Sequence, residues 1–97
     1  MPPDPDPSDT TAQFFVGLAA VTRTIRTRDR LSQAEVARRA RVGEKLIGAI
    51  EHGRANPSVT RLEQLARGLG LTGIAELGSR ADEAAERIAA TRIRPPA

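Results

Sequence analysis

The sequence predicts an all-α fold, a small bundle of short helices with a tail at each end. Apolar residues recur at spacings of three and four through most of the chain, which is the pattern of helices with one buried face. Ser or Thr stands before several of these segments and Gly after them, where helices begin and end. A chain of 97 residues can form one domain with a modest core, too small for a deep substrate cavity.

The composition excludes several classes of protein. There is no cysteine, so disulfides, thiolate nucleophiles and thiolate metal sites are impossible. No apolar run approaches the roughly 18 residues of a membrane span, so we expect no membrane partner. The proline-rich, acidic beginning lacks the basic-then-apolar order of a signal peptide, and we therefore expect a cytoplasmic protein.

The net charge of +3 is distributed unevenly. Residues 1–22 carry three Asp and no base, residues 23–54 carry nine basic against four acidic residues, and residues 55–97 carry six against five. A local positive excess is what a polyanionic partner requires. Arginines can also simply solvate helix faces in a chain rich in Ala and Arg, and the charge alone does not decide between these interpretations.

The first elements are an arm and a long helix. Residues 1–10 combine prolines with acidic residues and are expected to form a disordered, acidic arm. A helix is expected over residues 11–28, where Phe14, Leu18 and Ile25 fall on one face and would enter the core.

The central stretch, residues 31–53, predicts two short helices joined by a tight corner. The first covers residues 32–40 and is capped by Ser32; the second covers residues 44–52 and ends at Gly53. Helices this short gain little from propensity and must bury their apolar stripes against a neighbour. Two of them packed across a corner form a helix-turn-helix.

Two further helices are expected before Gly78, one capped by Ser58 and ending near residue 68, and a short one capped by Thr72. Gly78 is interpreted as a boundary, so residues 11–78 would form the domain. Residues 79–92 predict an additional helix with acids at its start and bases at its end, followed by a frayed tail at 93–97. The additional helix would either dock on the domain or form a dimer contact.

A set of residues at characteristic spacing extends through this region: Leu31-Ser32-Gln33, Val36-Ala37, Val42, Ile47, Ile50-Glu51, Gly53, Asn56-Pro57-Ser58, Leu62, Leu65-Ala66 and Leu69-Gly70-Leu71. With these residues the chain resembles the lambda-repressor/Cro-like (XRE-class) helix-turn-helix family, from near Leu18 to Leu77. The resemblance implies a five-helix DNA-binding domain with the helix at 79–92 added to it. It further implies a non-enzymatic transcriptional regulator that needs no cofactor and binds double-stranded DNA as a homodimer.

By the same resemblance, the helix at 44–52 would lie in the DNA major groove and be the recognition helix. Lys45 could then donate to guanine and Glu44 could accept from cytosine, while Gln33 would meet a phosphate or a base edge. His52 would contact a phosphate or the groove, or remain an uncommitted surface residue. The complete set of predicted DNA-binding residues is Gln33, Arg41, Gly43, Glu44, Lys45, Gly48, Ala49, His52, Arg54 and Asn56.

The family resemblance leads to structural predictions for two residues, Arg26 and Arg41. Arg26 is placed to pair with Glu51, a carboxylate beside the buried Ile50 that needs a partner. Arg41 replaces the glycine usual at the corner, a site that commonly needs positive φ. Either the turn is adjusted here, or the strain is accepted because Arg41 helps to bind phosphate.

A second class of function stays open. The predicted reading face includes Gly43, Gly48 and Ala49, which offer few groups for base recognition. The same fold could therefore be a protein-interaction module, antitoxin-like or adaptor-like, with weak DNA readout and a protein partner.

Overall fold

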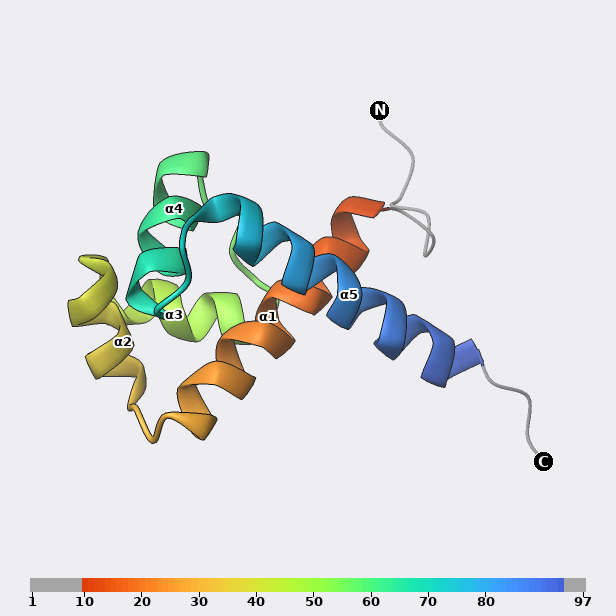
Figure 1. Ribbon diagram of the computed structural model, residues 1–97, viewed down its shortest axis with the longest axis horizontal. Helices are drawn as coiled ribbons and strands as arrows, with labels where there is room; N and C mark the ends of the chain where they lie inside the picture. Colours follow the sequence, from red (N-terminus) through yellow and green to blue (C-terminus); the bar gives the residue numbers. More distant parts are fainter. Residues whose placement is uncertain (1–9, 94–97) are drawn as a thin grey trace.

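The computed structural model describes residues 10–93, which form five α-helices and no strand. In chain order these are α1 (Thr10–Arg28), α2 (Gln33–Ala40), α3 (Glu44–Glu51), α4 (Val59–Gly68) and α5 (Ile74–Ile93) (Figure 1). The all-α prediction is confirmed. The predicted arm and frayed tail lie outside the described residues, except that Thr10 begins α1 and Ile93 ends α5.

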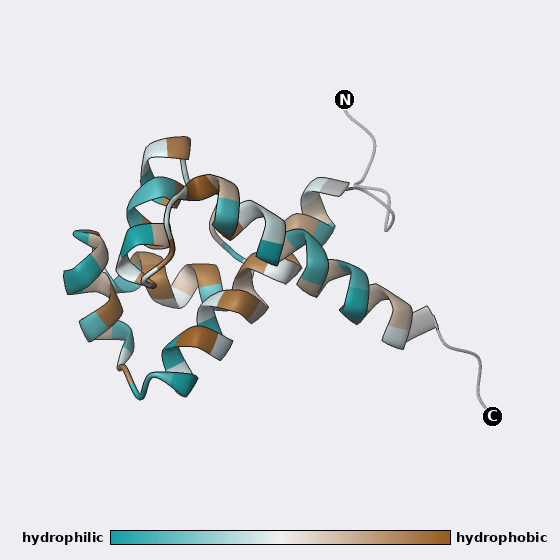
Figure 2. Ribbon diagram, viewed as in Figure 1, coloured by the Kyte–Doolittle hydropathy of each residue, from teal (hydrophilic) through white to brown (hydrophobic). Residues whose placement is uncertain are grey.

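α1 is the helix on which the bundle is assembled. Leu18 and Ile25 are buried, as their spacing predicts, and Val21 is buried with them, whereas Phe14 is only half-buried at the edge of the core. α3 and α5 both pack on α1, whereas α2 packs on α3 and α4. The hydrophobic segments of α1 and α3 lie toward the middle of the bundle, while α5 alternates between hydrophilic and weakly hydrophobic residues (Figure 2). No helix in residues 10–93 is long and apolar enough to cross a membrane.

The predicted boundary at Gly78 is wrong, because α5 continues through it from Ile74 to Ile93. A glycine inside a helix costs about 1 kcal/mol relative to alanine, a penalty that packing along the rest of the helix can exceed. That packing is visible downstream of Gly78, where Ala81, Ala84 and Ala85 are all buried. The short helix and the additional helix at 79–92 are therefore one element.

The middle of α5 docks on α1, which answers the question that the sequence left open. At the crossing, a Cβ placed on Gly17 would overlap the backbone carbonyl of Ala81. Only glycine allows the two backbones to approach this closely. The small residues of α5 are thus explained by a contact within the chain.

The group that caps the start of α5 is not Thr72, to which the prediction assigned the cap. The backbone amide of Ile74 donates to the Glu63 carboxylate on α4, at 2.9 Å. The Thr72 amide donates instead to Glu76, at 2.8 Å. The hydrogen bond from Arg67, together with the bond from the Ile74 amide, places the pKa of Glu63 below its usual value. α4 therefore supplies the group that caps α5.

Candidate nucleic-acid interface

α2 and α3 form the predicted helix-turn-helix. The Ser32 hydroxyl accepts from the Glu35 amide at 3.0 Å, and the Glu35 carboxylate accepts from the Ser32 amide at 3.2 Å. This reciprocal cap satisfies two amides at the start of α2, and the backbone bond lowers the pKa of Glu35. Val36 of α2 and Ile47 of α3 are fully buried, so each short helix is stabilised by its neighbours.

The corner between the two helices contains a strained residue. Arg41 adopts the left-handed conformation, with φ 60° and ψ 42°, as the C-cap of α2. Its amide donates to the Arg38 carbonyl, and the Val42 amide donates to the Ala37 carbonyl at 3.0 Å. This conformation costs a non-glycine residue about 1–2 kcal/mol. The turn is therefore not adjusted to avoid positive φ, and the Arg41 side chain is exposed.

The predicted pair between Arg26 and Glu51 is present. Arg26 Nε donates to Glu51 Oε2 at 2.6 Å and Nη2 donates to Oε1 at 2.9 Å, while the Glu51 side chain is 2% exposed. Burial alone would raise the pKa of Glu51. The hydrogen bonds from Arg26 and Gln33, with the charges of Arg26 and Arg23, outweigh it and place this pKa below its usual value. The pairing joins α1 to the C-terminal end of α3.

Sequence reasoning missed a third member of this network, Arg23. Its Nη2 donates to the Glu51 backbone carbonyl at 2.6 Å, and its Nε lies 3.9 Å from Glu51 Oε1. A signal was present, because Arg23 precedes Arg26 by three positions and so lies on the same side of α1. Arg23 thus satisfies a carbonyl at the end of α3 that the helix itself leaves unpaired.

Gln33, the first residue of α2, turns toward the interior of the unit. Its amide nitrogen donates to Glu51 Oε1 at 3.3 Å. Its amide oxygen would lie 3.5 Å from a Cβ placed on Gly48, an ordinary van der Waals distance. Glu51 therefore connects three helices, through Arg26 of α1, Gln33 of α2 and its own α3.

The outer face of α3 carries the predicted reading residues. Gly43, Glu44 and Lys45 are exposed at its start, and Gly48 and Ala49 are half-buried further along. The Glu44 and Lys45 side chains make no hydrogen bond or ion pair with any residue in the described range 10–93. Gly43 is the N-cap and provides no side-chain cap, so the first amides of α3 have no side-chain acceptor.

The far end of α3 and the following loop extend this surface. His52 is exposed, and its Nδ1 lies 2.7 Å from the Gly48 carbonyl oxygen one turn back. Gly53 follows with φ 69°, which allows the Arg54 amide to donate to the Ala49 carbonyl at 2.8 Å. Arg54 and Asn56 are exposed, and their side chains bond to no described residue.

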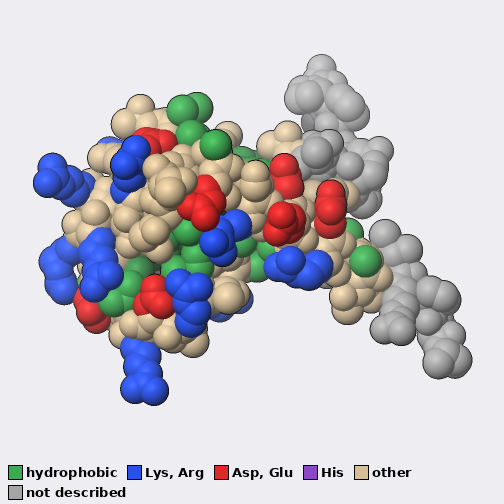
Figure 3. Space-filling view, in the orientation of Figure 1, with side chains coloured by type: hydrophobic (Ala, Val, Ile, Leu, Met, Phe, Trp, Pro, Cys, Tyr) green, Lys and Arg blue, Asp and Glu red, His purple; other side chains and the backbone are tan. Residues whose placement is uncertain are grey.

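The charge asymmetry of the sequence is a surface feature of the fold. Lys and Arg side chains gather at the end of the molecule formed by α2 and the neighbouring turns, whereas Asp and Glu are prominent over α5 (Figure 3). The exposed basic residues in and around the helix-turn-helix include Arg30, Arg38, Arg39, Arg41, Lys45, Arg54 and Arg61. Residues 10–93 contain no group of three or more His, Cys, Asp or Glu side chains that could hold a metal ion.

This arrangement defines a class of protein: an all-helical domain whose second and third helices form a helix-turn-helix beside a basic surface. A family profile described as a helix-turn-helix domain matches residues 18–77, which is more than half of the chain. The chain belongs to the helix-turn-helix family of lambda-repressor/Cro type, a family of DNA-binding regulators.

A solved structure shares the fold. The chain is similar to a crystal structure of a mutant of the restriction-modification controller protein C.Esp1396I, with a TM-score of 0.63. The two are 20% identical in sequence, and the match covers 72% of this chain and 89% of that chain. At this identity the likeness shows the fold alone. No curated protein matches the sequence.

Proposed function

We propose that this DNA-binding regulator recognises specific operator sequences by inserting α3 into the major groove. The observation that carries the proposal is the group of exposed polar side chains without partners at the start of α3 and in the loop that follows it. The side chains of Glu44, Lys45, Arg54 and Asn56 make no hydrogen bond or ion pair with any residue of the described range. Partnerless polar groups on a rigid helix-turn-helix, next to a basic surface, suit a polyanionic ligand.

A few residues of α3 would contact the base edges. Lys45 would donate to guanine O6 and N7, Glu44 would accept from cytosine N4, and Ala49 would touch a thymine methyl. Gly43 and Gly48 would allow the backbone to approach the bases. A Cβ would meet nothing within 4 Å at Gly43 and only the Gln33 amide at Gly48, so packing within the chain does not require glycine at either position.

Phosphate contacts would fix the orientation of α3. Arg41, Arg54 and Asn56 are exposed around it, and His52 lies at its C-terminal end. Gln33 would contact DNA at the start of α2, where the helix dipole favours a phosphate, and would exchange its 3.3 Å bond to Glu51 for that contact. Neutralised phosphates release counterions, so binding should weaken with salt by a slope of about 0.9 per phosphate.

The regulator would act in the cytoplasm, on the nucleoid, as a homodimer without enzymatic activity. Two copies of α3 would then read half-sites about one DNA turn apart. Since α5 docks within the chain, the dimer contact would use another surface. Val59 at the start of α4, which is 71% exposed, is the more exposed of the two large hydrophobic residues that the described surface presents, and is the position to test first. Sedimentation of the wild type and of Val59→Asp would test this, because a dimer formed through Val59 should dissociate in the variant.

A binding-site selection on the purified chain tests the recognition helix. Lys45→Ala should relax discrimination at one or two base positions, by about 1–3 kcal/mol each. Arg54→Ala should weaken binding to all sequences alike and reduce the salt slope by about one. Arg87→Ala is the matched control, since Arg87 is an exposed arginine on α5. An unchanged motif and affinity for Lys45→Ala would refute the assignment of α3.

The second candidate function is a protein-interaction module. The observation in its favour is that the predicted reading face offers few groups for base recognition. Gly43, Gly48 and Ala49 lie there beside only two charged side chains, Glu44 and Lys45. A gel shift against genomic fragments across a salt series separates the two functions. A preference of at least about a thousandfold over bulk DNA supports the regulator, and binding restricted to very low salt supports the module.

A further inference from the structure

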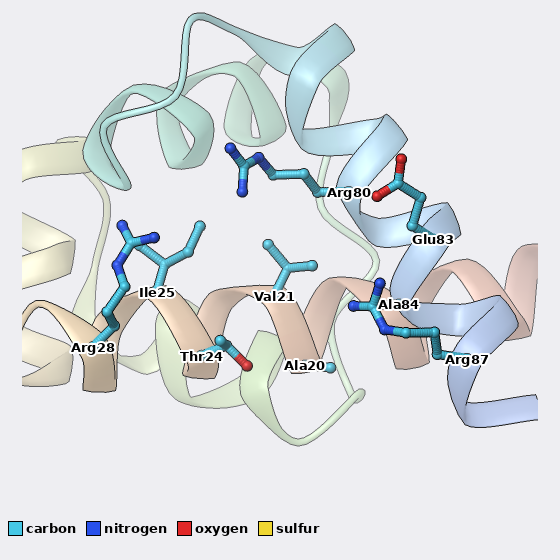
Figure 4. A pocket seen from close by; sticks show the side chains of 9 residues that line it. All are labelled: Ala20, Val21, Thr24, Ile25, Arg28, Arg80, Glu83, Ala84 and Arg87. Carbon is cyan, nitrogen blue, oxygen red and sulfur yellow. The ribbon is translucent and has the colours of Figure 1, made fainter. Parts of the chain in front are cut away.

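A hollow of about 230 Å³ lies between α1 and α5, away from the helix-turn-helix. The apolar side chains that line it include Val21 and Ile25 of α1 and Ala84 of α5, each less than 8% exposed. Arg28, Arg80 and Arg87 line it as well (Figure 4). In this view, Arg28 and Arg80 extend beside Ile25 and Val21, whereas Arg87 lies beside Ala84 at the other end.

The hollow follows from how the two helices cross. α1 and α5 cross at Gly17 and Ala81, where the missing side chain of Gly17 lets the backbone carbonyl of Ala81 lie close to α1. Beyond this crossing, small residues such as Ala20 and Ala84 do not fill the space between the helices. Long arginine side chains stand at the edges of that space. Its volume is below the roughly 300–1,000 Å³ of pockets for drug-sized ligands, so a smaller ligand fits.

The lining carries three guanidinium groups and one carboxylate, that of Glu83. Arg28 is bonded to Asp29 at 2.9 Å and Arg80 to Glu76 at 3.2 Å, both in exposed pairs. Such pairs contribute little and can exchange one anion for another. The Arg87 side chain has no hydrogen bond or ion pair with any residue that the structure describes. The hollow therefore combines available cationic groups with an apolar surface.

The hollow is separated from the recognition helix by α1. Successive residues of a helix are about 100° apart, which places Arg23 and Arg26 on the side of α1 opposite to Val21 and Arg28. Arg23 and Arg26 face α3 through their bonds to Glu51. A molecule in the hollow would therefore touch neither α2 nor α3, whose residues do not line it.

We propose that this hollow is a binding site for a small organic anion, a carboxylate attached to a compact apolar group. The carboxylate would accept hydrogen bonds from Arg87, whose side chain has no partner among the described residues, and from Arg80 after that side chain releases Glu76 and turns toward Arg87. Guanidinium groups bind carboxylates in a planar, two-bond geometry. The apolar group would cover Val21, Ile25 and Ala84 and remove their remaining surface from water. The site is distinct from the DNA-binding surface and would be available to an effector while DNA is bound.

Calorimetric titration of the full chain with three probes tests the site without DNA. Benzoate supplies both charge and apolar surface, benzyl alcohol the ring without the charge, and inorganic phosphate the charge without the ring. We expect saturable binding of benzoate, and binding of each of the other two weaker by about tenfold or more. Absence of saturable benzoate binding, or equal binding of phosphate, would overturn the proposal.

Two variants locate the binding on the protein. Arg80→Gln with Arg87→Gln removes exposed charges and should weaken benzoate about tenfold or more. Thr24→Leu keeps every charge but adds bulk at the exposed lining position of α1, and should weaken benzoate while leaving phosphate unchanged. Arg61→Gln on α4 is the matched control and should bind as the wild type does. Unaltered benzoate affinity in both hollow variants, each folded by circular dichroism, would refute the site.

Discussion

Replacing Arg26 by methionine tests how far the fold depends on the partner of a buried carboxylate. Methionine keeps much of the length and apolar stem of arginine but removes the guanidinium. The Glu51 carboxylate, 2% exposed, would then lose bonds of 2.6 and 2.9 Å. It would retain the 3.3 Å bond from Gln33 and the charge of Arg23, whose Nε lies 3.9 Å from Glu51 Oε1. The loop carbonyl of Leu31 would also lose a donor at 3.1 Å.

The expected cost is about 3 kcal/mol in the free energy of unfolding. Breaking a buried ion pair by removing one partner costs about 3–5 kcal/mol, because the other charge stays buried. The Arg26 side chain is 21% exposed and Gln33 still donates to Glu51, so the lower end of that range applies. A domain of this size has a total stability of about 5–15 kcal/mol. The variant should therefore remain folded at room temperature with a much lower denaturation midpoint.

The pH dependence of the stability of Arg26→Met supplies a second, independent test. In the wild type the pKa of Glu51 is lowered, so its contribution to stability is present above the unfolded pKa and is lost as pH falls through the folded pKa. In Arg26→Met, the hydrogen bonds from Arg26 no longer offset the burial of Glu51, so burial raises the pKa of Glu51 instead. Protonation then relieves the buried charge. The difference in stability between variant and wild type should shrink as pH falls from about 7 to about 4.

Urea denaturation followed by far-ultraviolet circular dichroism measures these differences, since the chain has no Trp or Tyr to report by fluorescence. Arg67→Met is the matched control, because it breaks an exposed pair with Glu63 and should cost less than about 1 kcal/mol. The reasoning fails if Arg26→Met costs no more than this control. It also fails if the cost of Arg26→Met is the same at both ends of the pH range.

Three further substitutions test backbone features by thermal denaturation. Gly78→Ala should stabilise the protein by up to about 1 kcal/mol, because its Cβ would meet nothing within 4 Å inside a continuous helix. Gly17→Ala should destabilise it by about 2 kcal/mol or more, because its Cβ would overlap the Ala81 carbonyl; equal effects of the two alanines would contradict the α1–α5 crossing. Arg41→Gly should stabilise the protein by about 1 kcal/mol, because glycine adopts the left-handed conformation without strain. A loss of stability would contradict the strain assigned to Arg41.

Features that depend on neighbours in the sequence were predictable. The apolar periodicity placed α1 to α4 within a residue or two, and Ser32 and Ser58 cap α2 and α4 as expected. The pairing of Arg26 with Glu51 was predicted from the family resemblance together with a physical requirement, that a carboxylate beside a buried apolar residue needs a cationic partner.

Features that depend on residues distant in the sequence were not predictable, apart from the pair of Arg26 and Glu51, which the family resemblance supplied. Glu63 caps α5 from another helix, eleven positions before Ile74. Gly78 resembles a boundary until the docking of Ala81 and Ala84 on α1 is known. The inward bond of Gln33 requires the position of Glu51, which the helix-turn-helix pattern alone does not give. The structure places the ten predicted DNA-binding residues at exposed or half-buried positions, and their contacts with DNA stay a prediction.

The continuous α5 changes what counts as the independently folding unit. The helix-turn-helix profile ends at residue 77, yet Ala81, Ala84 and Ala85 beyond it are buried. Gly17, just before its first residue, lies against the Ala81 carbonyl. A fragment trimmed to the matched residues would expose the flank of α1 that carries Leu18 and Val21. Domain boundaries drawn from a sequence match would therefore divide a cooperative core, and a transplantable version of this DNA-binding unit has to include α5.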